Sequence, residues 1–292
     1  MRNKINAFDV FNAVLMCVIL LLVLYPMYFI VIASFSDPNL VNRGEVLLLP
    51  KGITFEGYQR VFRETKIWTG YLNTIIYTVL HTVLGLIVTL AAAYSLSRKD
   101  FSARNLFMAV FMVTMFFSGG LIPSFLLMQN LHLIDTIWAV VLPGVVSVWN
   151  MVVARTYFQT SVPYELQEAA KIDGCSDFKV FYRVVLPLSA PIVAVIALFY
   201  AVGMWNQYFG ALIYLDSPEL FPLQLILREI LVQQQLTSQM TTGMAEAMAE
   251  QARIADLVKY VLMLVSTLPV MLIYPFIQRY FVKGIMVGAV KG

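Results

Sequence analysis

The most ordered pattern of charged and small residues in this chain lies between residues 158 and 187. Pro163 follows Ser161 and Val162, and a proline in the first turn, where its fixed φ is already helical, is typical of a helix start. Glu165 and Glu168 come next, in the turns where carboxylates interact favourably with the helix dipole. The segment therefore predicts a short helix with acidic residues near its start.

This predicted helix has one narrow apolar face made of small groups. Leu166, Ala169 and Ala170 fall at positions i, i+3 and i+4, and Gly174 is expected to end the helix. Alanine lets another backbone approach closely, and carboxylates beside it can pair with basic groups at the rim of a cleft. The pattern predicts docking into a partner protein. An ordinary amphipathic surface loop is the alternative.

Residues that could catalyse a reaction are few and scattered. The chain has two histidines and two cysteines, and it lacks a Cys-x-x-Cys pair, a glycine-rich phosphate loop and paired carboxylates that would face one pocket. Cys17 and Cys175 are expected to be free thiols. His81 is interpreted as a packed side chain, with a ligand or pore role as the alternative. The chain is predicted not to be an enzyme.

A very apolar chain carries these residues. Of its 292 residues, 60% are hydrophobic and 13% are charged, whereas a soluble domain is about half apolar and about a quarter charged. A soluble globule, a disordered chain and a nucleic-acid-binding protein each need a polar surface that this composition cannot cover. The chain is therefore predicted to lie in a lipid bilayer.

Six stretches are long enough to cross about 30 Å of hydrocarbon at about 1.5 Å per residue. They run from Val10 to Phe35, Tyr71 to Leu96, Leu106 to Met128, Ile137 to Tyr157, Pro187 to Leu215 and Leu257 to Phe281. The predicted fold class is all-α, a polytopic membrane protein with six transmembrane helices.

Basic residues indicate the orientation of these spans. If the N-terminus is cytoplasmic, most Lys and Arg residues fall inside and close to the span ends, whereas the others are spread over two long outer loops. The positive-inside rule counts charges near the span ends. Both termini and the 158–187 loop are therefore predicted to be cytoplasmic.

Ionisable side chains are almost absent from the six stretches, with no Asp or Glu at mid-bilayer depth. Proton- or sodium-coupled carriers usually need such a group to bind the driving ion. An intramembrane enzyme would need a nucleophile and base, or a metal set, within the spans. The pattern favours a carrier that takes its energy from elsewhere, and a secondary carrier or channel for a small polar solute is the alternative.

The 158–187 loop resembles a known motif. The run from Pro163 to Gly174, Pro-Tyr-Glu-Leu-Gln-Glu-Ala-Ala-Lys-Ile-Asp-Gly, continued by Val-Val-Leu-Pro at 184–187, is similar to the EAA loop of ATP-binding-cassette (ABC) importer permeases. Val184 stands where isoleucine is common. In that family the loop is the coupling helix that docks into a groove of the cytoplasmic ATPase. The resemblance implies ATPase-coupling roles for Glu165, Glu168, Ala169, Ala170, Asp173 and Gly174 and, at the C-terminus, for Lys291 and Gly292.

Two further stretches resemble the carbohydrate-uptake branch of this family, with the greatest likeness to oligosaccharide permeases. Residues 204–209, Met-Trp-Asn-Gln-Tyr-Phe, are similar to its Trp-Asn segment, and residues 278–292 are similar to its C-terminus. The resemblance implies that Trp205, Asn206 and Tyr208 line a substrate pathway. An aromatic face can stack on a sugar ring, and an amide can hydrogen-bond its hydroxyls. Packing of Trp205 into the bundle, with Asn206 bonded to a neighbouring helix, is the alternative.

The resemblance also implies a fold and a set of partners. The fold would be that of a type I ABC importer permease, with a first transmembrane helix and extracytoplasmic loop over 1–70 and a five-helix transmembrane domain over 71–292. The partners would be a second homologous permease, two cytoplasmic ATPase subunits, an extracytoplasmic solute-binding protein, a sugar or oligosaccharide, and the lipid bilayer, with no nucleic acid. No cofactor is expected in this chain, because the ATPase subunits would bind ATP and Mg. The location would be the cytoplasmic membrane of a bacterium, and the mechanism alternating access.

Overall fold

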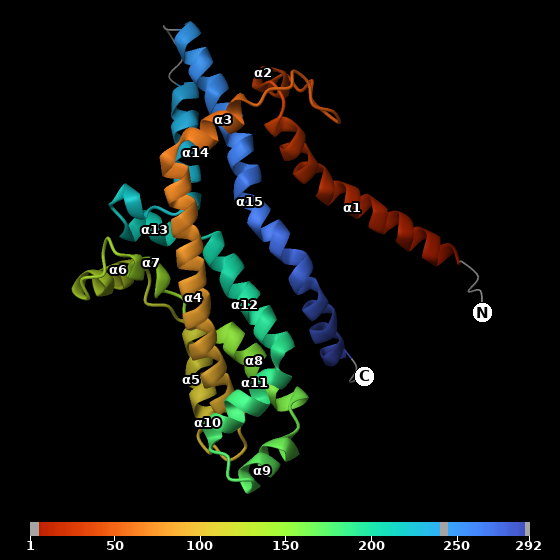
Figure 1. Ribbon diagram of the computed structural model, residues 1–292, viewed down its shortest axis with the longest axis vertical. Coiled ribbons are helices and arrows are strands. Elements are labelled where there is room, and N and C mark those ends of the chain that lie inside the picture. The colour runs from red at the N-terminus through yellow and green to blue at the C-terminus, as the bar shows by residue number, and fades with distance from the viewer. Residues whose placement is uncertain (1–5, 240–244, 290–292) are drawn as a thin grey trace. The chain divides into compact units, whose positions relative to one another are not determined.

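The computed structural model describes residues 6–239 and 245–289, and the secondary structure of these residues consists of helices without strands (Figure 1). The all-α prediction is therefore confirmed. The chain divides into two compact units, Met1–Ile67 with Leu227–Leu268 and Trp68–Ile226 with Pro269–Gly292. The long C-terminal helix α15 (Ala245–Ala289) contributes to both units. The division at residue 70 expected from the sequence stays a prediction.

The first unit contains α1 (Ala7–Ser34), α2 (Pro38–Asn42), α3 (Glu56–Arg63), most of α14 (Leu223–Gln239) and the first part of α15. Its core cluster includes Ile32 of α1, Val41 of α2 and Val46 of the following loop. The Glu56 carboxylate accepts from Arg60 at 2.8 Å and from Arg253 at 3.0 Å, and these bonds hold its pKa below the usual range. The second of these ion pairs fixes α3 against α15.

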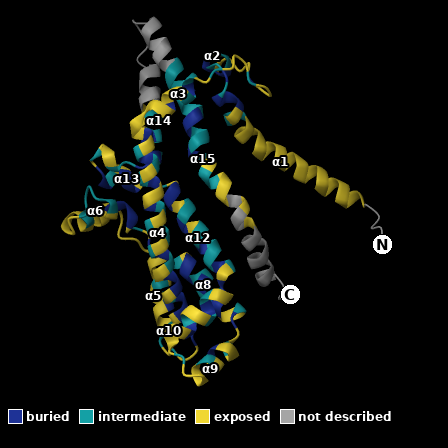
Figure 2. Cartoon of the chain, in the orientation of Figure 1, coloured by how far each residue is buried: buried dark blue, intermediate teal, exposed yellow. Residues whose placement is uncertain are grey.

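Helix α1 presents apolar side chains to its surroundings along most of its length (Figure 2). Only its last turn, Ile32 to Ser34, is buried. A helix of 28 residues is about 42 Å long, which exceeds the hydrocarbon thickness. Its composition and exposure are those of a helix that faces lipid or another membrane subunit.

The second unit is built around α4 (Thr65–Ser97), a 33-residue helix. The other elements are α5 (Arg104–Phe116), α6 (Leu121–Asn130), α7 (Ile137–Val141), α8 (Val148–Ser161), α9 (Tyr164–Ile172), α10 (Asp177–Val180), the π-helical turn η1 (Phe181–Val185), α11 (Leu186–Leu188), α12 (Ala190–Trp205), α13 (Phe209–Tyr214), the 3₁₀ turn η2 (Pro218–Leu220) and the end of α15. Two hydrophobic clusters lie along α4. One joins Tyr94 to residues of α5, α8 and α12, and the other joins Tyr77 to residues of α7 and α13.

Within the described part of the chain, three helices are long and apolar enough to cross a membrane: α1, α4 and the stretch Arg253–Ile273 of α15. Two bent pairs raise this number to five if each pair forms one span. The helical membrane architecture is thus confirmed, while three of the six predicted spans are not single helices.

The third predicted span bends by 110° between α5 and α6, where Gly120 has a φ of 86°. The fourth breaks between α7 and α8, around Pro143 and Gly144, and the fifth breaks after Trp205. An apolar run does not by itself specify a continuous helix. Glycine adopts a positive φ at little cost, and proline cannot donate the hydrogen bond that continuation needs.

Side chains from α4 and α12 satisfy the backbone groups freed at the break between α7 and α8. His81 Nδ1 donates to the Val141 carbonyl at 2.7 Å. The Tyr200 hydroxyl donates to the Val145 carbonyl at 3.0 Å and accepts from the Ser147 N–H at 3.1 Å. Non-helical backbone at membrane depth needs such partners. The interpretation of His81 as a packed side chain is confirmed, because it is buried against the Tyr200 ring.

Candidate functional site

Helix α9 has the bounds that the sequence indicates. Pro163 is its N-cap residue, and the helix ends at Ile172 with Asp173 as its C-cap. The Gly174 N–H donates to the Lys171 carbonyl at 3.0 Å and the Cys175 N–H to the Ala170 carbonyl at 2.9 Å, which is the pattern of a Schellman motif. Gly174 has a φ of 79°, a left-handed conformation that favours glycine. The predicted helix stop is confirmed.

The two glutamates of α9, Glu165 and Glu168, are exposed. The predicted apolar face is divided, because Ala170 is half-buried and packs against the core cluster, whereas Leu166 and Ala169 face outward. Ile172, which the sequence-based face did not include, is 86% exposed. The helix thus has three apolar side chains and two carboxylates that the rest of the unit does not cover.

A polar cavity of about 400 Å³ lies beside α9. Its lining residues come from the turn after α4, from Arg104 and from the segment 158–167. Arg98, Lys99 and Arg104 make this wall basic, and the Lys99 ammonium lies 4.9 Å from the centre of the Tyr164 ring. The exposed face of α9 is therefore acidic and apolar, and three basic residues line the hollow next to it together with Glu165.

Four charged residues connect the end of α4 to both sides of the Gly174 turn. We call Arg98, Asp100, Lys171 and Asp177 the charge ring. Arg98 Nε donates to Asp100 Oδ1 at 2.8 Å, and Lys171 Nζ lies 3.1 Å from Asp100 Oδ2. Asp177 Oδ1 lies 3.4 Å from Lys171 Nζ and 3.0 Å from Arg98 Nη1. The four pairs close a circuit in which each charge has two neighbours of opposite sign.

The charge ring favours the ionised forms of Asp100 and Lys171. The hydrogen bond from Arg98, with that from Lys171, holds the pKa of the Asp100 carboxyl well below its usual range. The hydrogen bond to Asp100 raises the pKa of Lys171. Sequence reasoning did not identify the ring, because its members are up to 79 positions apart. Two signals were available in the sequence. One was the charge cluster Arg98-Lys99-Asp100 at the end of a span, and the other was the pair of opposite charges, Lys171 and Asp177, on either side of Gly174.

Trp205, Asn206 and Tyr208 lie where α12 ends and α13 begins. Trp205 is buried, with its ring 5.7 Å from that of Tyr71 in an edge-on arrangement. Asn206 is exposed, and its Nδ2 donates to the Val202 carbonyl of its own helix at 2.9 Å. Tyr208 is also exposed. The structure therefore does not bring the three side chains into one pocket.

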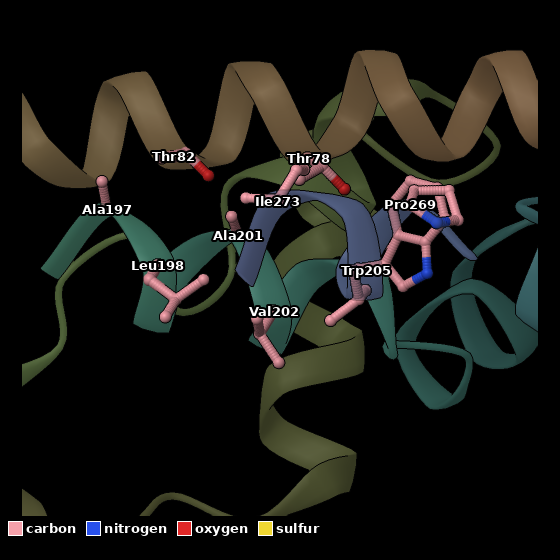
Figure 3. A pocket seen from close by; sticks show the side chains of 10 residues that line it. Thr78, Thr82, Ala197, Leu198, Ala201, Val202, Trp205, Pro269 and Ile273 are labelled. Atoms are coloured by element: carbon pink, nitrogen blue, oxygen red, sulfur yellow. The ribbon is translucent and has the colours of Figure 1, made fainter. Parts of the chain in front are cut away.

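Trp205 lines a pocket of about 170 Å³ formed by α4, α12 and the part of α15 beginning at Pro269 (Figure 3). Its walls are mainly apolar, and the hydroxyls of Thr78 and Thr82 project from α4 toward α12. Both hydroxyl oxygens are buried without a hydrogen-bond partner in the described part of the chain. The sequence reasoning did not select these threonines, although two hydroxyls spaced four residues apart on an apolar helix lie on one face.

Two of the residues expected from the sequence, Lys291 and Gly292, lie outside the described residues. The sequence also places Met240, Met244 and Met248 at four-residue spacing, which predicts a helix at the outer surface with the methionines as packing residues. Met240 and Met244 likewise lie outside the described residues. The sixth predicted span lies within α15, which begins 12 residues earlier than the sequence suggested.

These features define a class: a helical membrane protein that exposes a short, capped helix with a mixed acidic and apolar face. The family model described as "binding-protein-dependent transport system inner membrane component" matches residues 81–287. The chain belongs to this family. It is a permease subunit of an ABC importer and not an enzyme, and the match favours this function over that of a secondary carrier or channel.

Two relatives from Bacillus subtilis (strain 168) align along nearly their whole length. Protein LplC is 36% identical over 98% of this chain and 96% of its own. The polygalacturonan/rhamnogalacturonan transport system permease protein YtcP is 36% identical over 100% of both chains. A crystal structure of a bacterial ABC transporter involved in the import of the acidic polysaccharide alginate contains a chain that matches with a TM-score of 0.82 and 33% identity, over 96% of this chain and 99% of that one. The type I ABC importer permease fold is therefore confirmed.

Proposed function

We propose that this chain carries an oligosaccharide across the cytoplasmic membrane of a bacterium as one of two homologous permeases. An extracytoplasmic binding protein delivers the sugar, and two ATPase subunits, which bind ATP and Mg, supply the energy. The names of the relatives support a carbohydrate substrate, since YtcP is named for transport of polygalacturonan and rhamnogalacturonan and two AraQ permeases for transport of arabinooligosaccharides. Both termini and α9 face the cytoplasm in this proposal.

The observation that carries the proposal is the exposed face of α9. Leu166, Ala169 and Ile172 are apolar side chains that the rest of the unit leaves uncovered, and Glu165 and Glu168 flank them. A docking surface typically combines an apolar centre with a charged rim. Small Ala169 lets an ATPase groove approach the helix backbone, while the glutamates pair with basic groups at its rim.

Coupling requires that the two conformations of the ATPase act differently on this helix. ATP shifts the equilibrium only if it binds the closed ATPase pair more tightly than the open pair. Closure would displace α9, and the Schellman cap at Asp173 and Gly174 would keep the end of the helix defined during this movement. Alternating access follows if the displacement reaches the membrane helices.

The sugar pathway is proposed along the end of α12. Trp205 lines the pocket that contains the two unpartnered threonine hydroxyls, so it offers an aromatic face close to hydrogen-bonding groups. Asn206 and Tyr208 are exposed in the single chain and are proposed to face the second permease. Lys291 and Gly292 are proposed to contact the ATPase.

The first prediction tests the coupling role. Gly174→Val forces a β-branched residue into a left-handed conformation, which costs about 1–3 kcal/mol of local strain and should deform the end of α9. We expect oligosaccharide uptake by the reconstituted complex to fall about tenfold or more, with membrane insertion unchanged. Candidate probes are oligogalacturonides, alginate oligosaccharides and arabino-oligosaccharides. Glu168→Lys should weaken co-purification of the ATPase.

Gly44→Val is the matched control. Gly44 has a φ of 72° and, like Gly174, open space around the position of an added Cβ, so the strain is similar but lies far from α9 in sequence. Normal uptake in Gly174→Val, or an equal loss in both variants, would remove the coupling role from this loop. If a complex with active ATPase subunits transports none of the three sugar classes, the carbohydrate assignment is contradicted.

A further inference from the structure

The charge ring joins three segments that the chain order keeps apart. Arg98 and Asp100 follow α4 directly, Lys171 lies in the last turn of α9, and Asp177 begins α10. The ring therefore holds the coupling helix from both sides of the Gly174 turn. Rotation of α9 about that turn would separate Lys171 from Asp100, from Asp177, or from both.

Arg98 is the fixed member of the ring. Its side chain is 9% exposed, whereas those of Asp100, Lys171 and Asp177 are 47%, 38% and 65% exposed. Arg98 Nη1 also donates to the Tyr94 hydroxyl at 2.8 Å, and the Arg98 carbonyl accepts from Arg104 Nη1 at 2.9 Å. One guanidinium held by α4 thus presents a rigid fork to carboxylates on either side of it.

An aromatic contact reinforces the same connection. The Tyr94 ring stacks on the Phe181 ring at 4.9 Å, with an angle of 27° between their planes. Phe181 follows α10, so this contact ties the far side of the loop to α4, one turn before Arg98. The charge ring and the stacked Tyr94 and Phe181 rings together connect the segment from α9 to α10 with the end of α4.

Exposed ion pairs contribute little to stability when they act singly, and networks with ordered geometry contribute more. The ring has a net charge of zero and closes on itself, so the loss of one member leaves the remaining charges unbalanced. This arrangement suits the transfer of a displacement from one segment to another better than it suits bulk stabilisation.

We propose that the charge ring is the joint through which movement of the coupling helix reaches α4. Its four members are positioning residues for transport, and the proposal rests on the proposed docking of α9 to the ATPase. The ion pair between Lys171 and Asp100 is the best one to test, because it links α9 directly to the turn after α4.

The test uses the complete transporter in lipid nanodiscs. Hydrogen exchange is measured by mass spectrometry, without nucleotide and after trapping with ATP, Mg and vanadate, in wild type and in Lys171→Met. In wild type, trapping should change exchange in both α9 and the last two turns of α4. In Lys171→Met the change should persist in α9 and be lost in α4, while the ATPase still co-purifies.

Matched variants make the readout specific. Lys179→Met removes the same charge from an exposed position of the same loop outside the ring and should behave as wild type, and Lys171→Arg should restore the α4 response. Uptake per ATP hydrolysed should fall about tenfold in Lys171→Met and in Asp100→Asn. The double variant should be no worse than the poorer single variant, because the ring acts as a unit.

The outcomes separate the two proposals. If α9 does not respond to trapping in wild type, docking itself is wrong. If α9 responds and the α4 response in Lys171→Met equals that of wild type, docking stands and the charge ring is not the joint. If Lys179→Met loses the α4 response as Lys171→Met does, or if the losses of uptake add in the double variant, the proposal that the charge ring is the joint is likewise contradicted.

Discussion

Tyr200 shows how a single hydroxyl supports a broken membrane segment. It contacts Thr89 Oγ1 at 2.6 Å on α4, and it also bonds the Val145 carbonyl and the Ser147 N–H in the break before α8. The residue is 4% exposed, so water does not replace these bonds. A buried backbone group that loses its partner keeps its full desolvation cost.

Tyr200→Phe should therefore destabilise the protein without changing its packing. We expect the free energy of unfolding to fall by about 1–3 kcal/mol, measured by chemical denaturation of the purified complex in detergent. Tyr182→Phe removes a hydroxyl from a side chain that is 65% exposed and should have almost no effect. Equal stability of the two variants would mean that the break does not depend on the hydroxyl.

At the scale of elements, Gly85 of α4 lies against the Tyr200 ring of α12. A Cβ added there would lie 2.9–3.0 Å from three atoms of the Tyr200 ring. The end of a tyrosine ring can normally shift to make room, but this ring is held by hydrogen bonds to two segments. The glycine is therefore required by the position of a neighbouring side chain rather than by its own backbone.

Gly85→Ala should cost about 1–3 kcal/mol of stability through overpacking. Gly203→Ala on α12 has no atom within 4 Å of the added Cβ and is the control, expected to be neutral or slightly stabilising. In a Tyr200→Phe background the ring can move, so the cost of Gly85→Ala should shrink. Strict additivity of the two changes in denaturation experiments would contradict this coupling.

The elements also show what could be predicted from the sequence and why. Helix α9 and its end at Gly174 were predictable because the determinants are local: a proline, early carboxylates and a left-handed glycine. The breaks near Gly120 and Gly144 were not predictable, because glycine and proline also occur within continuous membrane helices, as Pro26 and Pro269 do here. Continuity depends on whether distant groups such as His81 and Tyr200 satisfy the freed backbone.

The candidate site, too, was only partly predictable from the sequence. The exposed glutamates of α9 could be anticipated from helical spacing, whereas the charge ring needs residues 98 and 177 to meet in space. Trp205 lines a pocket, so its substrate role stays a prediction, whereas Asn206 and Tyr208, its neighbours in sequence, do not line that pocket. Only a tertiary structure can pair Trp205 with Thr78 and Thr82.

At the scale of the whole molecule, the proposed function implies an orientation in the membrane. In that proposal the ATPase is cytoplasmic, so α9 would face the cytoplasm. The segment that contains Lys51 would then lie outside, because it precedes the N-terminal end of α4, whereas α9 is paired with Asp100 just after the C-terminal end of α4. The distribution of Lys and Arg supports the same orientation, since basic residues near span ends are retained inside. Two exposed lysines, Lys51 and Lys179, allow a direct comparison.

In a Cys17→Ser and Cys175→Ser background, which removes both native thiols, Lys51→Cys and Lys179→Cys each introduce one exposed thiol. A membrane-impermeant maleimide should label Lys51→Cys in intact spheroplasts and Lys179→Cys only in inverted vesicles. Detergent-solubilised protein should show both sites fully labelled, which controls for reactivity. Labelling of Lys179→Cys from outside would place α9 beyond the reach of an ATPase and would refute both the coupling role and the joint at the charge ring, because each requires α9 on the side where ATP is hydrolysed.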